Sequence, residues 1–415
     1  MVPRVLLLTG VAPGRVGVGS VFLRDLCMLY PRDRICCFHT TAQPEGEASR
    51  ELDWLPIQFA PSPREHGING FGQTAGRLIR PFLERCIELS RIRRLVSQAT
   101  RFGKTHHVDL VWATLHTPTT HRLAKAVADS LHVPLVCTVW DPPANVLREV
   151  YRLDRYTLAR LLATFERTVR FATRCGVASD NMRRRYEQDF GTQCITMIYG
   201  APRDEEARSQ AARPQDGPLI IGFAGGIYAR EEWGAFLAAL ASRDWRVAGR
   251  DVVVRVLGVG LPPSAAWPVR MEFLGWRDRA ETVRLLAQTD LAYLPYGFDD
   301  SRRQWVQLSF PGKLADYAAA GVPVLYHGPI DSSVMDFLQR FPMGCGCHSV
   351  NHDEIVATLE RLVTDTEFYR RAKLACNEAY HEELSASVFR KRFAELIGVR
   401  EDSLLSAECT TRPGA

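Results

Sequence analysis

Short apolar runs alternate with helical patterns along this chain, and the alternation is interrupted once. In the first half, apolar runs predict strands and amphipathic stretches predict helices. The predicted strands are 5–8, 35–39, 108–113, 135–139 and 175–178, and the predicted helices are 21–30, 121–131, 153–174 and 181–189. Strands that are separated by helices pair in parallel, in a sheet with helices on both faces. The first half therefore predicts an α/β domain.

A second α/β domain is predicted beyond residues 202–218, a stretch rich in charged residues, alanine and proline that indicates a linker. The strands predicted there are 219–223, 252–257, 271–274, 291–294 and 322–326, and the helices are 233–241, 280–288 and 313–320. Charged amphipathic helices follow at 354–363 and 367–384, and a last helix at 387–397 has an apolar face. The two halves thus repeat one architecture.

Composition sets limits on the class of protein. At about 100–200 residues per domain, 415 residues suit two or three domains. A net charge of +5 is too small to indicate a nucleic-acid partner, and no apolar run approaches the roughly 20 residues of a membrane span. The 11 cysteines are scattered and odd in number, which favours a reducing, cytoplasmic location. Cys345, Cys347 and His348 lack further ligands at a zinc-site spacing, so no metal is predicted.

A loop opens the helix 313–320, and its residues suit a phosphate group. Pro311 and Gly312 precede Lys313, and Asp316 lies one helical turn further on. The first turn of a helix presents backbone N–H groups and the positive end of the helix dipole. We expect Lys313 and the backbone N–H groups of residues 312–314, which follow Pro311, to hold a phosphate, and Asp316 to accept hydrogen bonds from a sugar hydroxyl.

Each half also begins with a strand followed by a glycine loop. Gly17 and Gly19 follow the first strand, but a third glycine at the G-x-G-x-x-G spacing is absent, as is an acid after the strand 35–39. These absences argue against a nicotinamide dehydrogenase. A plain turn and a loop that contacts an acceptor both remain open for this segment. In the second half, Gly225 and Gly226 allow a close backbone approach, and Arg230 is placed to pair with a diphosphate.

Two aromatic-rich strand ends complete the set of candidate sites. Asp141 follows Trp140 directly after the strand 135–139, and ligands of open α/β sheets bind at the carboxyl ends of strands. An aspartate before a proline is also common in ordinary turns, so both interpretations stand. Trp276 ends the strand 271–274, where it either stacks on a base or belongs to the core between the domains.

Residues 77–104 form a basic run with an apolar stripe. Its cations outnumber the two acids Glu84 and Glu88, and they are Arg77, Arg80, Arg85, Arg91, Arg93, Arg94, Arg101 and Lys104. One interpretation is a helix packed on the core with a solvated charged face. The other is a helix that lies on an anionic membrane near a lipid-linked acceptor.

Residues 219–330 resemble the retaining glycosyltransferases of family four, which share the GT-B fold. The resemblance is carried by residues 222–227, 273–276, 290–295 and, most specifically, 310–324. It implies two Rossmann-like α/β domains that face each other across a cleft. We expect an N-terminal domain at 1–200, a C-terminal domain at 201–386, a return helix on the N-terminal domain at 387–399, and a disordered tail at 400–415.

The resemblance also implies roles for the candidate residues. The donor would be a nucleotide diphosphate sugar, with no other cofactor and no metal ion. The residues assigned to the donor are Gly225, Gly226, Trp276, Pro311, Gly312, Leu314 and Asp316, with Asp316 on the ribose. The catalytic residues are Asp141, Lys313 and Arg230, and Gly17 and Gly19 contact the acceptor.

The sequence departs from the family pattern at two places. The family carries two acids separated by seven residues; Asp316 matches the second, and Leu308 stands at the first. The family's histidine at the end of a first-domain strand is not evident, and Asp141 or His116 takes a comparable place.

These features predict a glycosyltransferase that moves a sugar to a glycan, lipid-linked or small-molecule acceptor, and the resemblance alone implies that it does so with retention. The alternatives are a non-catalytic GT-B protein that binds a glycan or a partner transferase, and a nucleotide-sugar epimerase.

Overall fold

The computed structural model describes residues 2–15, 17–40, 50–61, 86, 88–203, 217–258 and 270–405. Contacts divide the chain into two compact units: Met1–Met197 with Arg390–Ala415, and Ile198–Phe389. The domain boundaries expected after residues 200 and 386 lie three residues from those two divisions.

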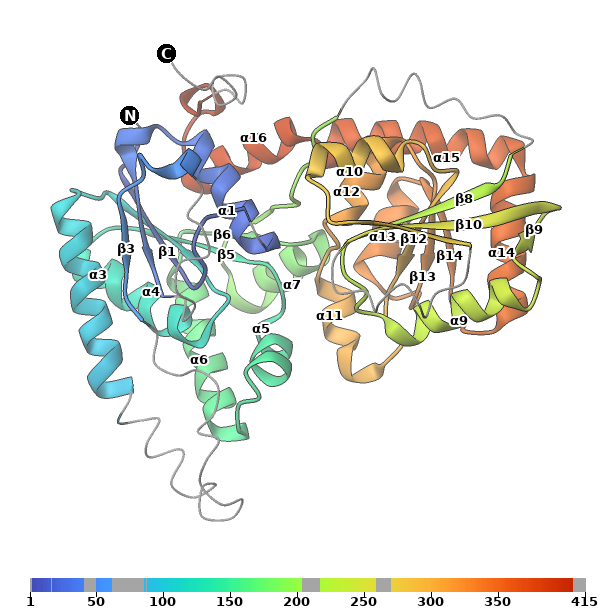
Figure 1. Ribbon diagram of the computed structural model, residues 1–415. Coiled ribbons are helices and arrows are strands. Elements are labelled where there is room, and N and C mark those ends of the chain that lie inside the picture. The colour runs from blue at the N-terminus through green and yellow to red at the C-terminus, as the bar shows by residue number, and fades with distance from the viewer. Residues whose placement is uncertain are drawn as a thin grey trace. The chain divides into compact units, whose positions relative to one another are not determined.

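The first unit contains a parallel sheet in the order β3-β2-β1-β4-β5-β6-β7 (Figure 1). Its strands are β1 Val5–Thr9, β2 Ile35–His39, β3 Ile57–Phe59, β4 Leu110–Thr114, β5 Leu135–Val139, β6 Arg174–Val177 and β7 Cys194–Thr196. Every residue of β1, β2, β4 and β5 is buried. Burial on both faces is what makes parallel strands continuously apolar, and it explains why these runs predicted the strands correctly.

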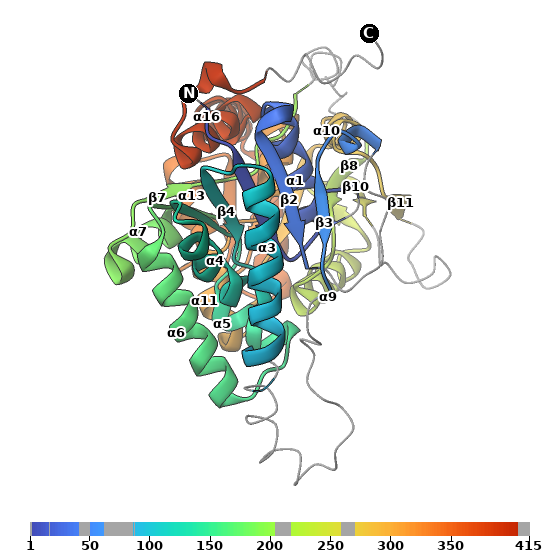
Figure 2. The same ribbon diagram turned by 90° about the vertical axis from the view of Figure 1, so that its left-hand side faces the viewer.

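Helices cover both faces of the first sheet. They are α1 Val18–Leu29, α3 Arg93–Thr105, α4 Pro118–Leu131, α5 Pro143–Asn145, α6 Arg155–Phe171 and α7 Asp180–Phe190. Figure 2 shows α3, α4 and α6 side by side over one face. The chain returns to this unit through α16, Ala386–Ile397, whose Phe393 ring lies 5.0 Å from that of Trp112 on β4.

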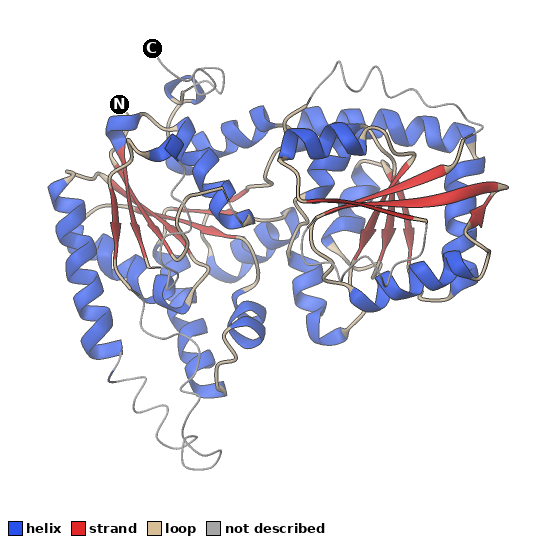
Figure 3. Cartoon of the chain, in the orientation of Figure 1, coloured by secondary structure: helices blue, strands red, loops and turns tan. Residues whose placement is uncertain are grey.

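The second unit repeats the topology. Its parallel strands run in the order β11-β10-β8-β12-β13-β14, and β9 pairs antiparallel with β10. Figure 3 shows the strands of this sheet in red with blue helices around them. The strands are β8 Leu219–Ala224, β9 Arg246–Val247, β10 Arg250–Leu257, β11 Met271–Gly275, β12 Leu291–Pro295, β13 Val324–His327 and β14 Gly344–Cys347. The strand order reverses between β8 and β12, and the carboxyl ends of strands at such a point are where doubly wound sheets bind ligands.

Helices flank this second sheet as well. They are α9 Arg230–Ala241, α10 Arg279–Leu286, α11 Arg303–Leu308, α12 Lys313–Ala320, α13 Ser333–Arg340, α14 His352–Thr364 and α15 Thr366–Ala379. The predicted bounds of α12 are correct. The strand β14 was not predicted, because its sequence Gly-Cys-Gly-Cys contains no branched or aromatic residue.

The expectation of a disordered tail is wrong for its first residues. Leu404 is buried, and the N–H group of Leu405 donates to the carbonyl oxygen of Leu29 at 2.8 Å. Arg390 donates to the carbonyl oxygen of Leu404 at 2.6 Å. A short 3₁₀ turn, Glu401–Ser403, thus packs against the first unit, while residues 406–415 lie outside the described part of the chain.

Candidate functional site

The helix α12 is held rigidly at the carboxyl edge of the second sheet. Its last turn closes at Gly321, which has a φ of 68° that suits glycine, and Pro323 prevents continuation. The Tyr317 hydroxyl donates to the carbonyl oxygen of Tyr293 at 3.1 Å and accepts from the N–H of Ala224 at 3.2 Å. These two bonds connect α12 to the middle of β12 and to the end of β8. Because Lys313 lies four residues before Tyr317, both side chains lie on the same helix face.

The side chain of Lys313 contacts the glycine loop that follows β8. Its Nζ atom donates to the carbonyl oxygen of Gly226 at 3.3 Å and lies 4.3 Å from the centre of the Phe223 ring. Burial lowers the pKa of Lys313 to about 7, and the nearby Asp316 carboxylate opposes that shift. The structure thus brings together Lys313 and the glycine loop, which the sequence analysis assigned separately to the donor.

The glycine loop has a backbone conformation that favours glycine at residue 225. Gly225 has a φ of +91°, and its N–H donates to the carbonyl oxygen of Leu257 at 2.7 Å. A Cβ atom on Gly225 would lie 3.7 Å from Lys313 Nζ. Gly225 therefore supplies a left-handed turn, and Gly226 supplies the carbonyl group that holds the lysine.

Asp316 has a charged partner within its own unit. Its Oδ1 atom accepts a hydrogen bond of 2.6 Å from Nε of Arg279, the first residue of α10. Both side chains are largely buried, with 14% and 20% exposure. Burial raises the pKa of the Asp316 carboxyl, while Arg279 and Lys313 oppose the rise. Sequence reasoning missed Arg279. The sequence did contain one indication: a cation in the first turn of a helix is unfavourable beside the helix dipole, so a nearby anion is expected.

The backbone N–H groups of this turn only partly match the prediction. The N–H of Leu314 donates to the carbonyl oxygen of Pro311 at 3.0 Å, and its side chain is in the core. The N–H of Ala315 likewise donates to Gly312. The assignment of Leu314 to a ligand is therefore corrected, because a tight first turn uses its N–H within the chain. Among the groups predicted to hold a phosphate, the N–H groups of Gly312 and Lys313 remain as candidates.

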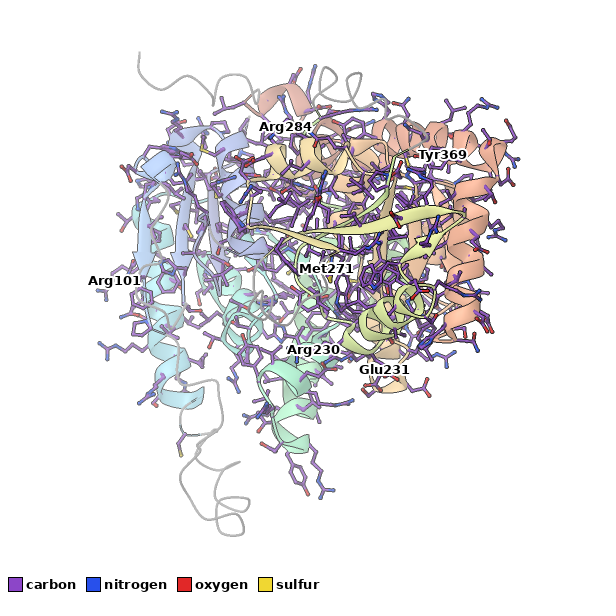
Figure 4. All side chains as sticks on the ribbon, turned by 45° about the vertical axis from the view of Figure 1, so that its right-hand side comes forward. Arg101, Arg230, Glu231, Met271, Arg284 and Tyr369 are labelled. Atoms are coloured by element: carbon purple, nitrogen blue, oxygen red, sulfur yellow. The ribbon has the colours of Figure 1, made fainter. Side chains whose placement is uncertain are left out.

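Arg230 and Trp276 are both exposed in the second unit. Arg230 is the first residue of α9 and is labelled in Figure 4; no ion pair of its guanidinium is recorded in the described part of the chain. Trp276 follows β11 with 61% of its surface exposed, so it does not belong to the core of its own unit. Both side chains are available to a ligand.

In the first unit, positions 17 and 19 favour glycine for two different physical reasons. Gly17 has a φ of +87° and precedes α1. Gly19 lies inside α1, and a Cβ atom there would come within 2.7 Å of the Trp140 ring. Gly19 thus permits close packing of Trp140, which also contacts Phe22 edge-on at 5.4 Å. The loop is more than a plain turn, because it shapes the surroundings of the residue beside Asp141.

Asp141, Trp140 and His116 gather at the carboxyl ends of β5 and β4. The His116 ring lies 5.3 Å from that of Trp140. Burial lowers the pKa of His116, and the negative charge of Asp141 opposes that effect. The Trp140 Nε1–H group is buried and has no hydrogen-bond partner within the described residues. The structure therefore brings together the acid and the histidine that the sequence offered as alternatives.

The basic run 77–104 packs its apolar residues inward where the structure describes it. Within the described part of 77–104, Leu95 and Ala99 are buried and the arginines of α3 are exposed, so the apolar stripe packs on the core. Residues 77–85 lie outside the described part of the chain.

Leu308 stands at the position of the first acid of the family pattern, and it is buried at the end of α11. No helix among the described residues is long and apolar enough to span a membrane, and no three potential ligands there gather for a metal.

Comparison with known proteins gives similarity at the level of structure. No protein-family model and no curated protein matches the sequence. HepE from Anabaena in complex with UDP is similar at 15% identity, with a TM-score of 0.64 over 95% of this chain and 99% of that chain. The chain has the GT-B fold. This result confirms the fold class predicted from the sequence.

Two further solved structures have the same architecture. Sucrose-phosphate synthase from Thermosynechococcus elongatus has 12% identity and a TM-score of 0.64, over 95% of this chain and 98% of that chain. The α,α-trehalose 6-phosphate synthase from Burkholderia multivorans has 14% identity and a TM-score of 0.62, over the whole of both chains. The GT-B similarity thus extends over the full length and is not confined to the second unit.

Proposed function

We propose that this chain is a glycosyltransferase that transfers a sugar from a nucleoside diphosphate sugar, with retention of configuration at the anomeric carbon. One observation carries the proposal: Lys313, at the start of α12, lies directly over the glycine loop 225–226. A lysine in the first turn of a helix is unfavourable beside the positive end of the dipole, and the acid in that turn, Asp316, is already paired with Arg279, so a further anion is favoured there. On a GT-B fold, a diphosphate is the anion that this arrangement best suits.

The proposed chemistry follows from charge compensation. When the bond from the sugar C1 atom to the diphosphate oxygen breaks, its electron pair remains on the diphosphate. Lys313 and Arg230 stabilise that developing charge, together with the N–H groups of Gly312 and Lys313. The acceptor hydroxyl oxygen forms the new bond to C1, and its proton passes to the departing phosphate. In this scheme the side chains replace a metal ion, and no further cofactor takes part.

The remaining residues recognise the two substrates. Asp316 accepts hydrogen bonds from the ribose, and exposed Trp276 stacks on the base. Asp141, with His116 and the glycine loop 17–19, orients a glycan, lipid-linked or small-molecule acceptor. The similar HepE structures contain UDP, one of them with glucose, which supports UDP-glucose as the first donor to test.

Donor hydrolysis by the purified protein tests the proposal. UDP-, GDP- and ADP-glucose are supplied with and without simple sugar acceptors, and release of the nucleoside diphosphate is measured. We expect slow hydrolysis of one donor, no effect of a chelator, and a loss of about 100-fold or more in Lys313→Ala, since removing one preorganised charge-stabilising group typically has that effect. Arg284→Ala, on the exposed side of α10, serves as the control.

The alternatives give other outcomes. An epimerase converts the nucleotide sugar without an acceptor and without releasing the diphosphate. A non-catalytic glycan-binding protein shows neither activity, although it binds a sugar. Heat-stability measurements help here, because a donor at 100 times its Kd stabilises the folded protein by about 2.7 kcal/mol.

A peripheral membrane contact through α3 is a separate part of the proposal. Arg93, Arg94 and Arg101 are exposed on this helix, and its sequence contains no acid. Since its apolar residues are packed inward, attraction to anionic lipid would be electrostatic, at about 1 kcal/mol per cation. Co-sedimentation with phosphatidylglycerol vesicles at low salt, lost at high salt and absent with phosphatidylcholine, is the expected result. Equal binding to both lipids would contradict it.

A further inference from the structure

Arg279 makes three hydrogen bonds, each from a different nitrogen atom. Nε donates to Asp316 Oδ1 at 2.6 Å, Nη1 donates to the carbonyl oxygen of Gly200 at 2.6 Å, and Nη2 donates to that of Tyr199 at 3.1 Å. The guanidinium also stacks on the Tyr199 ring at 4.0 Å. Three of its five N–H groups therefore donate to protein acceptors, and these bonds hold the guanidinium beside Asp316.

The backbone that anchors Arg279 is itself held firmly. A Cβ atom on Gly200 would lie 2.1 Å from the carbonyl oxygen of Ser385, so the two backbones are in direct contact. The N–H of Ala201 donates to Leu384 at 2.9 Å, and the Tyr380 hydroxyl donates to Ala201 at 3.3 Å. The three acceptors of Arg279 therefore fix its position, and through it the orientation of the Asp316 carboxylate.

Asp316 retains the capacity to accept further hydrogen bonds. A carboxylate offers about four acceptor positions, and Arg279 takes one of them. No other hydrogen bond to Asp316 is recorded in the described residues. The carboxylate is 14% exposed, which leaves an opening for small donor groups. Two adjacent hydroxyl groups suit one carboxylate that is held in a single orientation.

We propose that Arg279 is a positioning residue, which holds Asp316 so that the site selects nucleotides whose ribose carries both the 2′- and the 3′-hydroxyl groups. The inference rests on the proposed function, since it needs a nucleoside diphosphate in the second unit. It goes beyond that function because it names the residue that determines selectivity for the sugar of the nucleotide. Neither hydroxyl group is needed for the diphosphate to reach Lys313.

The test compares affinities by calorimetry for UDP and its 2′,3′-dideoxy analogue. The wild-type protein is expected to bind UDP about 10-fold or more tightly than the analogue, as hydrogen bonds to a charged group imply. In Arg279→Gln, the affinity for UDP falls to that for the analogue, whose own affinity changes by less than about twofold. Arg284→Gln, a neighbouring arginine on the exposed side of α10 labelled in Figure 4, retains the wild-type ratio.

A double variant separates the loss of the positioning role from misfolding. Arg279→Gln leaves a buried carboxylate without its partner, so the double variant Arg279→Gln with Asp316→Asn removes both charges together. It is expected to fold and to bind both nucleotides equally. The inference is overturned if a folded Arg279 variant retains the UDP preference, or loses affinity for both nucleotides to the same degree. A wild-type protein that binds both equally also overturns it, whereas one that binds neither overturns the proposed function itself.

Discussion

The ammonium group of Lys313 lies 4.3 Å from the centre of the Phe223 ring, on the strand that ends in the glycine loop. The aromatic ring and the Gly226 carbonyl oxygen together hold the side chain at the carboxyl edge of the second sheet. Burial of the side chain removes water from the cation and favours the neutral amine, whereas the face of the ring attracts the ammonium form. The ring therefore helps to position the lysine, while burial lowers its pKa.

Donor binding is expected to weaken above pH 7. Burial lowers the pKa of Lys313 to about 7, whereas the Asp316 carboxylate, paired with Arg279, opposes the shift. A bound diphosphate favours the ammonium form, so at pH 8 the protein should take up close to one proton per UDP-glucose. The Kd should rise towards 10-fold per pH unit above 7 and level off below it. Calorimetry in buffers of different ionisation enthalpy measures both quantities.

Lys313→Arg is the control for this pH dependence, because arginine remains protonated throughout. Its Kd should not change between pH 6.5 and 8.5. The sign for the empty protein is opposite: above pH 7 the unfolded chain binds more protons at Lys313, so this residue makes the fold more stable as pH rises. A wild-type Kd that is constant over the same range would contradict the prediction.

Trp276→Ala should weaken binding of nucleotides but not of inorganic pyrophosphate. The side chain is 61% exposed, so its loss should leave the fold intact. Stacking on a base contributes about 1–3 kcal/mol, which corresponds to a rise of about 5- to 150-fold in the Kd of UDP. Leu374→Ala, an equally exposed apolar residue on α15, is the matched control. An equal loss of pyrophosphate binding would exclude the stacking role.

Gly19→Ala should destabilise the first unit by about 1–3 kcal/mol, because the new methyl group collides with the Trp140 ring. Chemical denaturation measures the change, and near-ultraviolet circular dichroism should show that Trp140 has moved. Gly234→Ala on α9 has open space around its Cβ position and should instead stabilise the protein by about 0.5–1 kcal/mol. If Gly19→Ala were as stable as the wild type, the packing argument would fail.

Asp141→Asn should reduce kcat/KM for the acceptor by about 100-fold and leave the Kd of the donor nearly unchanged. The substitution also has a second readout that does not depend on activity. Since the negative charge of Asp141 raises the pKa of His116 against the effect of burial, its removal should lower that pKa further. A titration of the histidine resonances by NMR would detect the change, and an increase in the pKa would contradict the assignment.

The strands and helices that the sequence predicted best are those whose signal is local. The bounds of β2, β5 and α12 agree with the prediction, because each is a continuous apolar run or an alanine-rich helix closed by Gly321. The strand β14 was not predicted because its pairing with β13 at the edge of the sheet and its cover by α13 and α14, and not its own residues, make it a strand. The glycine loop, Lys313 and Asp316 were recognised for the same local reason, since their spacing within one segment is informative.

By itself, the sequence determined two α/β halves, their strand runs and the segment that presents Lys313. Tertiary structure alone decided that Arg279 holds Asp316, although 37 residues separate them, and that Trp140 packs on Gly19. Periodicity records which face of an element is buried, so it can be read from neighbouring residues. The partner of a buried charge depends on which elements the sheet brings side by side, and that information is distributed over the whole chain.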